Sequence, residues 1–134
     1  MSTIPVAAQL IAATLGGRVR GWNRDYVLRC TQILRQSEDP MWARIRKLLE
    51  ERGLQPSTSI LATSFPDDSM FEFCIVVTAD RKVFQFGFNY LHKPIEEGVV
   101  VEWVNITEDY FSSHYPEVIT TALALLDEPN GPAA

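Results

Sequence analysis

The residue types of a nucleophilic active site occur together in one short stretch near the C-terminus. Ser113 and His114 follow Asp109 closely, and serine hydrolases combine these three residue types. The same stretch is also typical of a helix N-terminus, with Ser113 as the cap, Pro116 in the first turn and Glu117 near the positive end of the helix dipole. We interpret the stretch as a helix cap, so no catalytic residue is predicted there.

The two cysteines and the second histidine form no metal or cofactor pattern. Cys30 and Cys74 both fall on expected regular elements with apolar neighbours, which favours buried free thiols over a disulfide. His92 lies in a loop beside Glu96 and Glu97, where a general base is conceivable but a solvated histidine is the simpler interpretation. No ligand spacing and no glycine-rich phosphate loop occurs. The sequence therefore predicts no metal and no cofactor, and it favours a protein that is not an enzyme.

Charge is distributed unevenly along the chain, whose net charge is −5. Residues 1–56 hold nine Lys/Arg and five Asp/Glu, a balance of +4, whereas residues 57–134 hold three and twelve, a balance of −9. The two halves could simply pack together, or the acidic half could meet a basic partner. The candidate partner contacts are the acidic residues expected in loops at strand ends, namely Asp67, Asp68, Glu96, Glu97, Glu108 and Asp109.

A basic segment with one tryptophan precedes the second expected helix. Arg18, Arg20 and Arg24 bracket Trp22, and basic residues interleaved with an aromatic ring can follow a nucleic-acid backbone. The acidic pI of about 5.0 argues against dependence on phosphate contacts. Nucleic-acid binding is therefore the weakest of the functions we consider.

Helical periodicity dominates the first 56 residues. We expect helices over Ile4–Leu15, over Arg24–Gln36 with Asn23 as its cap, and from Pro40 to just before Gly53 with Asp39 as its cap. The apolar N-terminal segment lacks the Lys or Arg with which a signal peptide begins, so we expect it in the mature chain and the protein in the cytoplasm. No apolar run is long enough to span a membrane.

A period of two residues begins after Pro56 and predicts strands over 59–65, 71–77, 84–90 and 99–106, with a final helix over 113–126. In the central hairpin, a loop of two or four residues would place Phe71, Phe73, Ile75 and Val77 on one face with Phe84, Phe86, Phe88 and Tyr90. The third and last helices are expected to cover this face. The face of strand 99–106 is ambiguous, which suggests burial on both sides or a twist.

These patterns predict a single α+β domain over residues 1–134. Its core is a four-stranded antiparallel meander, preceded by two or three N-terminal helices and followed by a C-terminal helix that packs on the sheet. Residues 1–56 form the helical part, 57–128 the sheet and last helix, and 129–134 a disordered tail.

One stretch of the sequence has a recognisable pattern. A VVT strand, a charged turn and the aromatic strand ending at Tyr90 are followed by Glu97-Gly98 and Glu102-Trp103. Within about residues 70–110 this pattern resembles short bacterial proteins to which no activity is attached. The resemblance implies a bacterial, cytoplasmic domain and implies no reaction.

The predicted function is that of a non-catalytic, acidic protein-binding domain, in its most specific form an immunity or inhibitor protein that neutralises a basic partner such as a toxin. The first alternative is a small-molecule-binding domain or enzyme, with a pocket between the aromatic sheet face and the helices lined by Tyr90, His92, Glu102 and Trp103. The second is a nucleic-acid accessory protein acting through Arg18, Arg20, Trp22 and Arg24. A homodimer is compatible with each of them.

Overall fold

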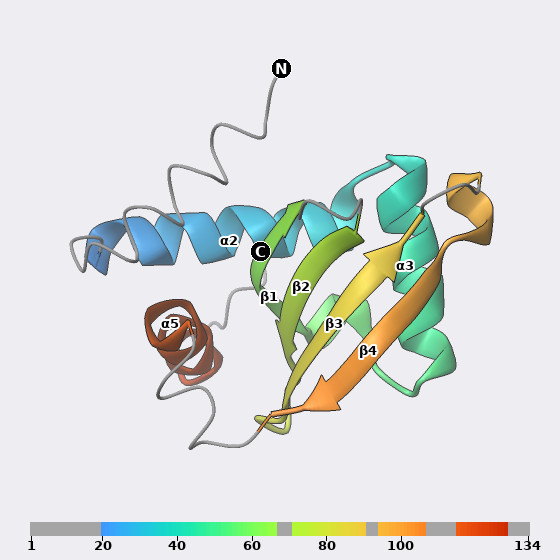
Figure 1. The fold of residues 1–134 in the computed structure, drawn as a ribbon. Coiled ribbons are helices and arrows are strands. Elements are labelled where there is room, and N and C mark those ends of the chain that lie inside the picture. The colour runs from blue at the N-terminus through green and yellow to red at the C-terminus, as the bar shows by residue number, and fades with distance from the viewer. Residues whose placement is uncertain (1–19, 67–70, 91–93, 107–114, 129–134) are drawn as a thin grey trace.

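The computed structural model describes residues 20–66, 71–90, 94–106 and 115–128 (Figure 1). Its elements are, in chain order, α2 (Arg20–Gln36), α3 (Pro40–Glu51), the 3₁₀ turn η1 (Pro56–Thr58), β1 (Ile60–Pro66), β2 (Phe71–Val77), β3 (Val83–Asn89), the 3₁₀ turn η2 (Ile95–Glu97), β4 (Val99–Asn105) and α5 (Pro116–Leu126). The expected helix over residues 4–15 and the expected tail lie outside the described residues. In the described part, no helix has the length and apolar character needed to cross a membrane.

The predicted α+β architecture is confirmed. The four strands form one antiparallel sheet in the order β1-β2-β3-β4, so consecutive strands are neighbours throughout. Helices α2 and α3 precede the sheet, and α5 follows it. Figure 1 shows α3 behind the sheet, α2 beside β1, and β4 at the opposite edge.

The ends of α3 match the capping signals in the sequence. The Asp39 carboxylate accepts a hydrogen bond from the Met41 amide at 2.8 Å, and Pro40 occupies the first turn. Gly53 adopts a left-handed φ of 85° and donates its amide to the Glu50 carbonyl at 3.0 Å.

The start of α2 was predicted wrongly. The helix begins at Arg20, so Asn23 lies inside it, and the described part of the basic segment forms the first turns of the helix. An N-cap contributes only about 1 kcal/mol, and α2 has tertiary partners that outweigh this preference. Its side chains contact β1, and Arg24 forms an ion pair with Glu128 just beyond α5.

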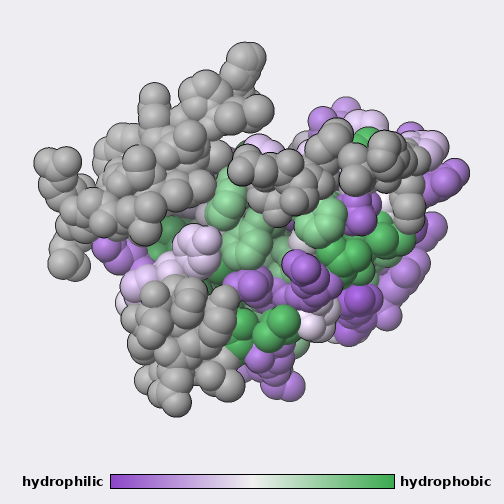
Figure 2. Space-filling view, viewed as in Figure 1, coloured by the Kyte–Doolittle hydropathy of each residue, from purple (hydrophilic) through white to green (hydrophobic). Residues whose placement is uncertain are grey.

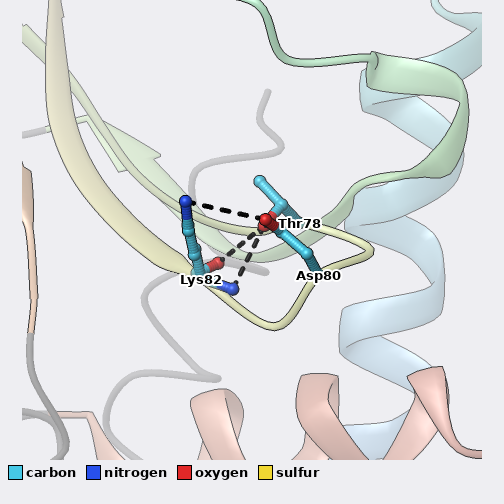
Figure 3. Close-up of polar contacts among 3 residues, drawn as sticks. All are labelled: Thr78, Asp80 and Lys82. Atoms are coloured by element: carbon cyan, nitrogen blue, oxygen red, sulfur yellow. Dashed lines mark hydrogen bonds and ion pairs between the residues drawn. The ribbon is translucent and has the colours of Figure 1, made fainter.

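The register of the β2–β3 hairpin also differs from the prediction. The loop has three residues, Ala79–Arg81, because the Arg81 amide bonds to the Thr78 carbonyl at 2.8 Å and Arg81 then adopts a left-handed φ of 69°. The Thr78 hydroxyl holds this loop by hydrogen bonds with the Asp80 carboxylate, the Lys82 amide and the Lys82 carbonyl (Figure 3).

This three-residue loop moves the aromatic residues of β3 to the other face of the sheet. Phe73 pairs with Gly87 and Cys74 pairs with Phe86, which shifts the expected pairing by one residue. The inner face, toward α3, therefore carries Cys74, Val76, Phe84, Phe86 and Phe88, whereas the outer face carries Phe71, Phe73, Ile75, Val77, Val83, Gln85, Gly87 and Asn89. The expectation that both aromatic sets share one covered face is wrong.

A bulge in β4 resolves the ambiguity of that strand. Glu102 and Trp103 together lie opposite Phe86, since Val101 pairs with Gly87 and Val104 with Gln85. Glu102 adopts a left-handed φ of 56°. Trp103 consequently stacks on the inner face against Phe84 and Phe86, with ring centroids 4.9 and 5.3 Å away. Val101 and Val104, on either side of the bulge, both lie on the outer face.

Helix α5 starts later than predicted. It begins at Pro116, and its N-cap residue is Tyr115, in a left-handed conformation without a capping side-chain hydrogen bond. The expected cap, Ser113, lies outside the described residues. The Tyr115 ring packs against Phe73 on the outer sheet face, with centroids 5.5 Å apart. Together with the buried side chains of α5, this places the helix over the β1–β2 side of the molecule.

Candidate protein-binding surface

The two cysteines are buried next to polar side chains. The Ser64 hydroxyl donates to the Glu72 carboxylate and contacts the Cys74 thiol, and Tyr26 is adjacent to Cys30. Burial raises the pKa of the Cys30 thiol to about 12 and, together with the nearby Glu72 charge, raises the pKa of Cys74 well above its ordinary value. Both thiols are therefore protonated at neutral pH, which suits packing and not nucleophilic attack. In the described residues, no group of three His, Cys, Asp or Glu side chains could hold a metal ion.

The predicted pocket residues are not gathered at one place. The ring of Tyr90 lies 6.0 Å from that of Phe88, beyond one end of β3. Trp103 packs near the other end of β3, and the Arg52 guanidinium lies 4.9 Å above its ring. Glu102 is exposed, and His92 lies outside the described residues. A small-molecule site lined by these residues stays a prediction.

The predicted nucleic-acid residues lie in the first turns of α2. Arg20, Trp22 and Arg24 belong to the helix, and Arg18 precedes the described residues. The Arg24 guanidinium pairs with the Glu128 carboxylate at 2.7 Å, so this charge has an acidic partner within the chain.

Two of the six predicted acidic contacts can be placed. Glu96 and Glu97 are exposed on η2, the turn that leads directly into β4. Glu102, predicted as a pocket residue, is exposed in the middle of β4 and adds a third carboxylate to this edge of the molecule. None of the three takes part in a salt bridge with another described residue. Asp67, Asp68, Glu108 and Asp109 lie outside the described ranges.

The outer sheet face near β4 is incompletely covered. We call this area the open sheet face; it comprises Phe71, Gly87, Val99, Val101 and Val104. The four side chains are half-buried or exposed, and Val104 is 46% exposed, whereas Phe86 and Phe88 on the inner face of the same sheet are 1% and 0% exposed. Figure 2 shows apolar side chains on this side of the molecule, with hydrophilic ones between and around them.

Gly87 forms the floor of the open sheet face. A Cβ at this position would lie 3.2 Å from the Phe71 ring and 3.5 Å from the Val101 side chain, so both neighbours lean over the glycine. The surface over Gly87 is therefore apolar, with Phe71 on one side of the glycine and Val101 on the other. Sequence reasoning missed this face because the predicted register placed Phe71 in a covered aromatic layer.

The two edge strands of the sheet differ in whether other parts of the chain bond to their outer backbone groups. Along β1, α2 supplies hydrogen-bond partners: Thr31 accepts from the Leu61 amide at 3.0 Å, and Arg35 donates to the Ser59 carbonyl at 2.9 Å. The outer edge of β1 is thus satisfied by side chains. Among the strands that the structure describes, none pairs with the outer edge of β4. This free edge borders the open sheet face directly.

The chain matches no protein-family model, no curated protein and no solved structure. Its function therefore has to be inferred from the geometry and charge of its own residues.

Proposed function

We propose that this chain is a non-catalytic protein-binding domain that takes a partner with a basic surface through the open sheet face. The supporting observation is the exposure of apolar side chains on the outer face near β4. Phe71, Val99 and Val101 are half-buried there and Val104 is 46% exposed, whereas Phe86 and Phe88 on the inner face are 1% and 0% exposed. Contiguous exposed apolar surface bordered by polar residues is characteristic of interaction sites.

The charge around this face supports a basic partner. Glu96, Glu97 and Glu102 surround the start and middle of β4, and residues 57–134 carry a balance of −9. An acidic border speeds association with a basic protein and disfavours acidic competitors. In the most specific form of the proposal, the chain is an immunity or inhibitor protein that neutralises a basic toxin. We place it in the bacterial cytoplasm, where Cys30 and Cys74, both free in the structure, stay reduced.

The chain offers a matched pair of positions for testing the surface. Val104 on the open sheet face and Ile33 on α2 are both β-branched, and their exposed fractions are 46% and 43%. We would immobilise the wild type, Val104→Ser and Ile33→Ser and capture partners from the source lysate. If Val104 becomes buried in an interface, losing its apolar contact costs about 1 kcal/mol, a weakening of roughly fivefold.

The expected result is a basic protein whose binding is weakened by Val104→Ser and unchanged by Ile33→Ser. A second pair tests the charge. Glu96→Gln with Glu97→Gln should slow association and reduce its salt dependence, whereas Glu50→Gln with Glu51→Gln, the same charge change on α3, should not. Equal effects in the two members of both pairs would contradict the proposed surface.

A further inference from the structure

The backbone of β4 directs hydrogen-bonding groups away from β3 at defined positions. The Ile106 amide donates to the Val83 carbonyl at 2.9 Å, and Val104 and Val101 pair with Gln85 and Gly87. Because backbone groups of consecutive strand residues alternate between the two edges, the amides of Val101 and Val104 point toward β3. On each side of the bulge the alternate residues, Val100 and Asn105, therefore direct their amides to the free edge.

The two edges of the sheet are protected in different ways: the chain covers the edge of β1, whereas β4 carries a central charge and a bulge. Side chains of α2 occupy the outer edge of β1, as shown by the Thr31 and Arg35 hydrogen bonds. Proteins usually shield an exposed strand edge, because unpaired edges recruit other strands. On β4 a strand from a partner could supply the hydrogen bonds that α2 supplies to β1.

The centre of β4 disfavours pairing between two copies of the chain. Glu102 is the fourth of the seven residues Val99–Asn105, so an antiparallel pair centred on the strand would bring two Glu102 carboxylates opposite each other. Its bulge also increases the local twist of the edge. A strand with Lys or Arg facing Glu102 would meet attraction in place of repulsion.

We infer, on the basis of the proposed function, that the partner binds by adding an extended basic strand to the free edge of β4, with a Lys or Arg side chain opposite Glu102. The main chain of that strand pairs with the Val100 and Asn105 amides, and its alternate side chains continue the open sheet face beyond Val101 and Val104. The occupant is thus a basic β-strand segment of another protein.

The first probe is a phage-displayed library of linear 12-residue peptides selected on the full-length chain. We expect enriched peptides in which β-branched residues alternate with Lys or Arg. Their binding should fall at least tenfold with Glu102→Lys and stay unchanged with Glu50→Lys, an exposed glutamate on α3. Selection of no peptide, or of peptides without basic residues, would overturn the inference.

The second readout is amide hydrogen exchange measured by NMR with the best enriched peptide. Bound peptide should slow exchange at Val100, at Asn105 or at both, and Asn105→Pro should weaken it at least tenfold while Asn105→Ala, which keeps the amide, does not. Unchanged exchange at both amides, with equal binding of the two Asn105 variants, would overturn strand addition. Dimerisation of the free chain through β4, detected by sedimentation and abolished by Asn105→Pro, would overturn it as well.

These outcomes separate the two proposals. If the lysate partner depends on Val104 but leaves the Val100 and Asn105 amides unprotected, the proposed surface stands and strand addition fails. If no partner depends on Val104, the proposed function fails, whatever the peptides show.

Discussion

Substituting Gly98 by alanine tests whether the junction between η2 and β4 is held by packing. The φ of Gly98 is −61° and its ψ 152°, a conformation that alanine adopts freely. On backbone grounds alone, Gly98→Ala would stabilise the protein by about 0.4–1 kcal/mol, because alanine restricts the unfolded chain. The surrounding side chains reverse this sign.

The reversal comes from the Phe88 ring. An alanine Cβ at Gly98 would lie 2.2 Å from Cζ and 2.6 Å from Cε1 of Phe88, far inside the roughly 3.5–4.0 Å of a normal carbon contact. The ring is 0% exposed, and the Gly98 carbonyl is fixed by a 3.0 Å hydrogen bond from Arg44. Overpacking of this kind costs about 1–3 kcal/mol.

We therefore expect Gly98→Ala to lower the free energy of unfolding by about 2 kcal/mol, roughly a 30-fold change in the folding equilibrium. Urea unfolding followed by tryptophan fluorescence measures this change, and the thermal midpoint should fall by about 8 °C. Gly53→Ala is the control for backbone strain: nothing lies within 4 Å of its Cβ, but its φ is 85°, so the cost should be about 1 kcal/mol.

The double variant isolates the contact. Phe88→Leu shortens the side chain that the methyl group of Gly98→Ala would contact. The double variant should therefore lose at least about 1 kcal/mol less free energy of unfolding than the sum of the two single losses. A Gly98→Ala protein as stable as the wild type, or more stable, would refute the packing argument for this junction.

Two further predictions concern the hairpin loop and the buried thiols. Arg81→Gly should raise the free energy of unfolding, measured in urea, by about 0.5–1 kcal/mol. Relief of the left-handed φ at Arg81 exceeds the loss of its exposed ion pair with Asp127. The control Asp127→Asn, which removes only the ion pair, should not raise the free energy of unfolding. Burial raises the pKa of Cys30 from its ordinary value of 9.0 to about 12. This shift contributes stability that is fully present below pH 9.0 and is lost as the pH rises toward about 12. Urea unfolding should therefore show stability falling over that range, less steeply in Cys30→Ala, and an unchanged slope would contradict the assignment. At pH 8, Ellman's reagent should react with neither Cys30 nor Cys74 until the protein unfolds.

Periodicity and capping predicted the elements because they depend on neighbouring residues. The helix that starts at Pro40 and the four strands follow directly from such local signals. The candidate surface was predicted only in part. Glu96 and Glu97 were identified as exposed loop carboxylates, which local sequence can indicate, whereas exposure of Phe71 and Val104 depends on which face each strand turns toward the helices.

Apart from the start of α2, the errors have a common physical origin in three residues with a left-handed backbone. Arg81 makes the hairpin loop three residues long, Glu102 turns Trp103 to the inner face, and Tyr115 begins α5 without a side-chain cap. From sequence alone, glycine or asparagine is expected at such positions, because a left-handed backbone destabilises other residues by roughly 1–2 kcal/mol. Here the conformations at Glu102 and Tyr115 are accompanied by aromatic contacts remote in sequence, whereas Thr78 holds the loop around Arg81.

The two aromatic contacts also determine which part of the sheet stays open. Stacking of Trp103 on Phe84 and Phe86 holds the bulge that leaves Val101 and Val104 together on the outer face. The Tyr115 ring, packed on Phe73, belongs to the N-cap of α5, which lies over the β1–β2 side. A strained backbone conformation persists only where the surrounding structure holds it in place. The aromatic contacts that hold these two left-handed residues therefore also produce the apolar face on which the proposed function rests.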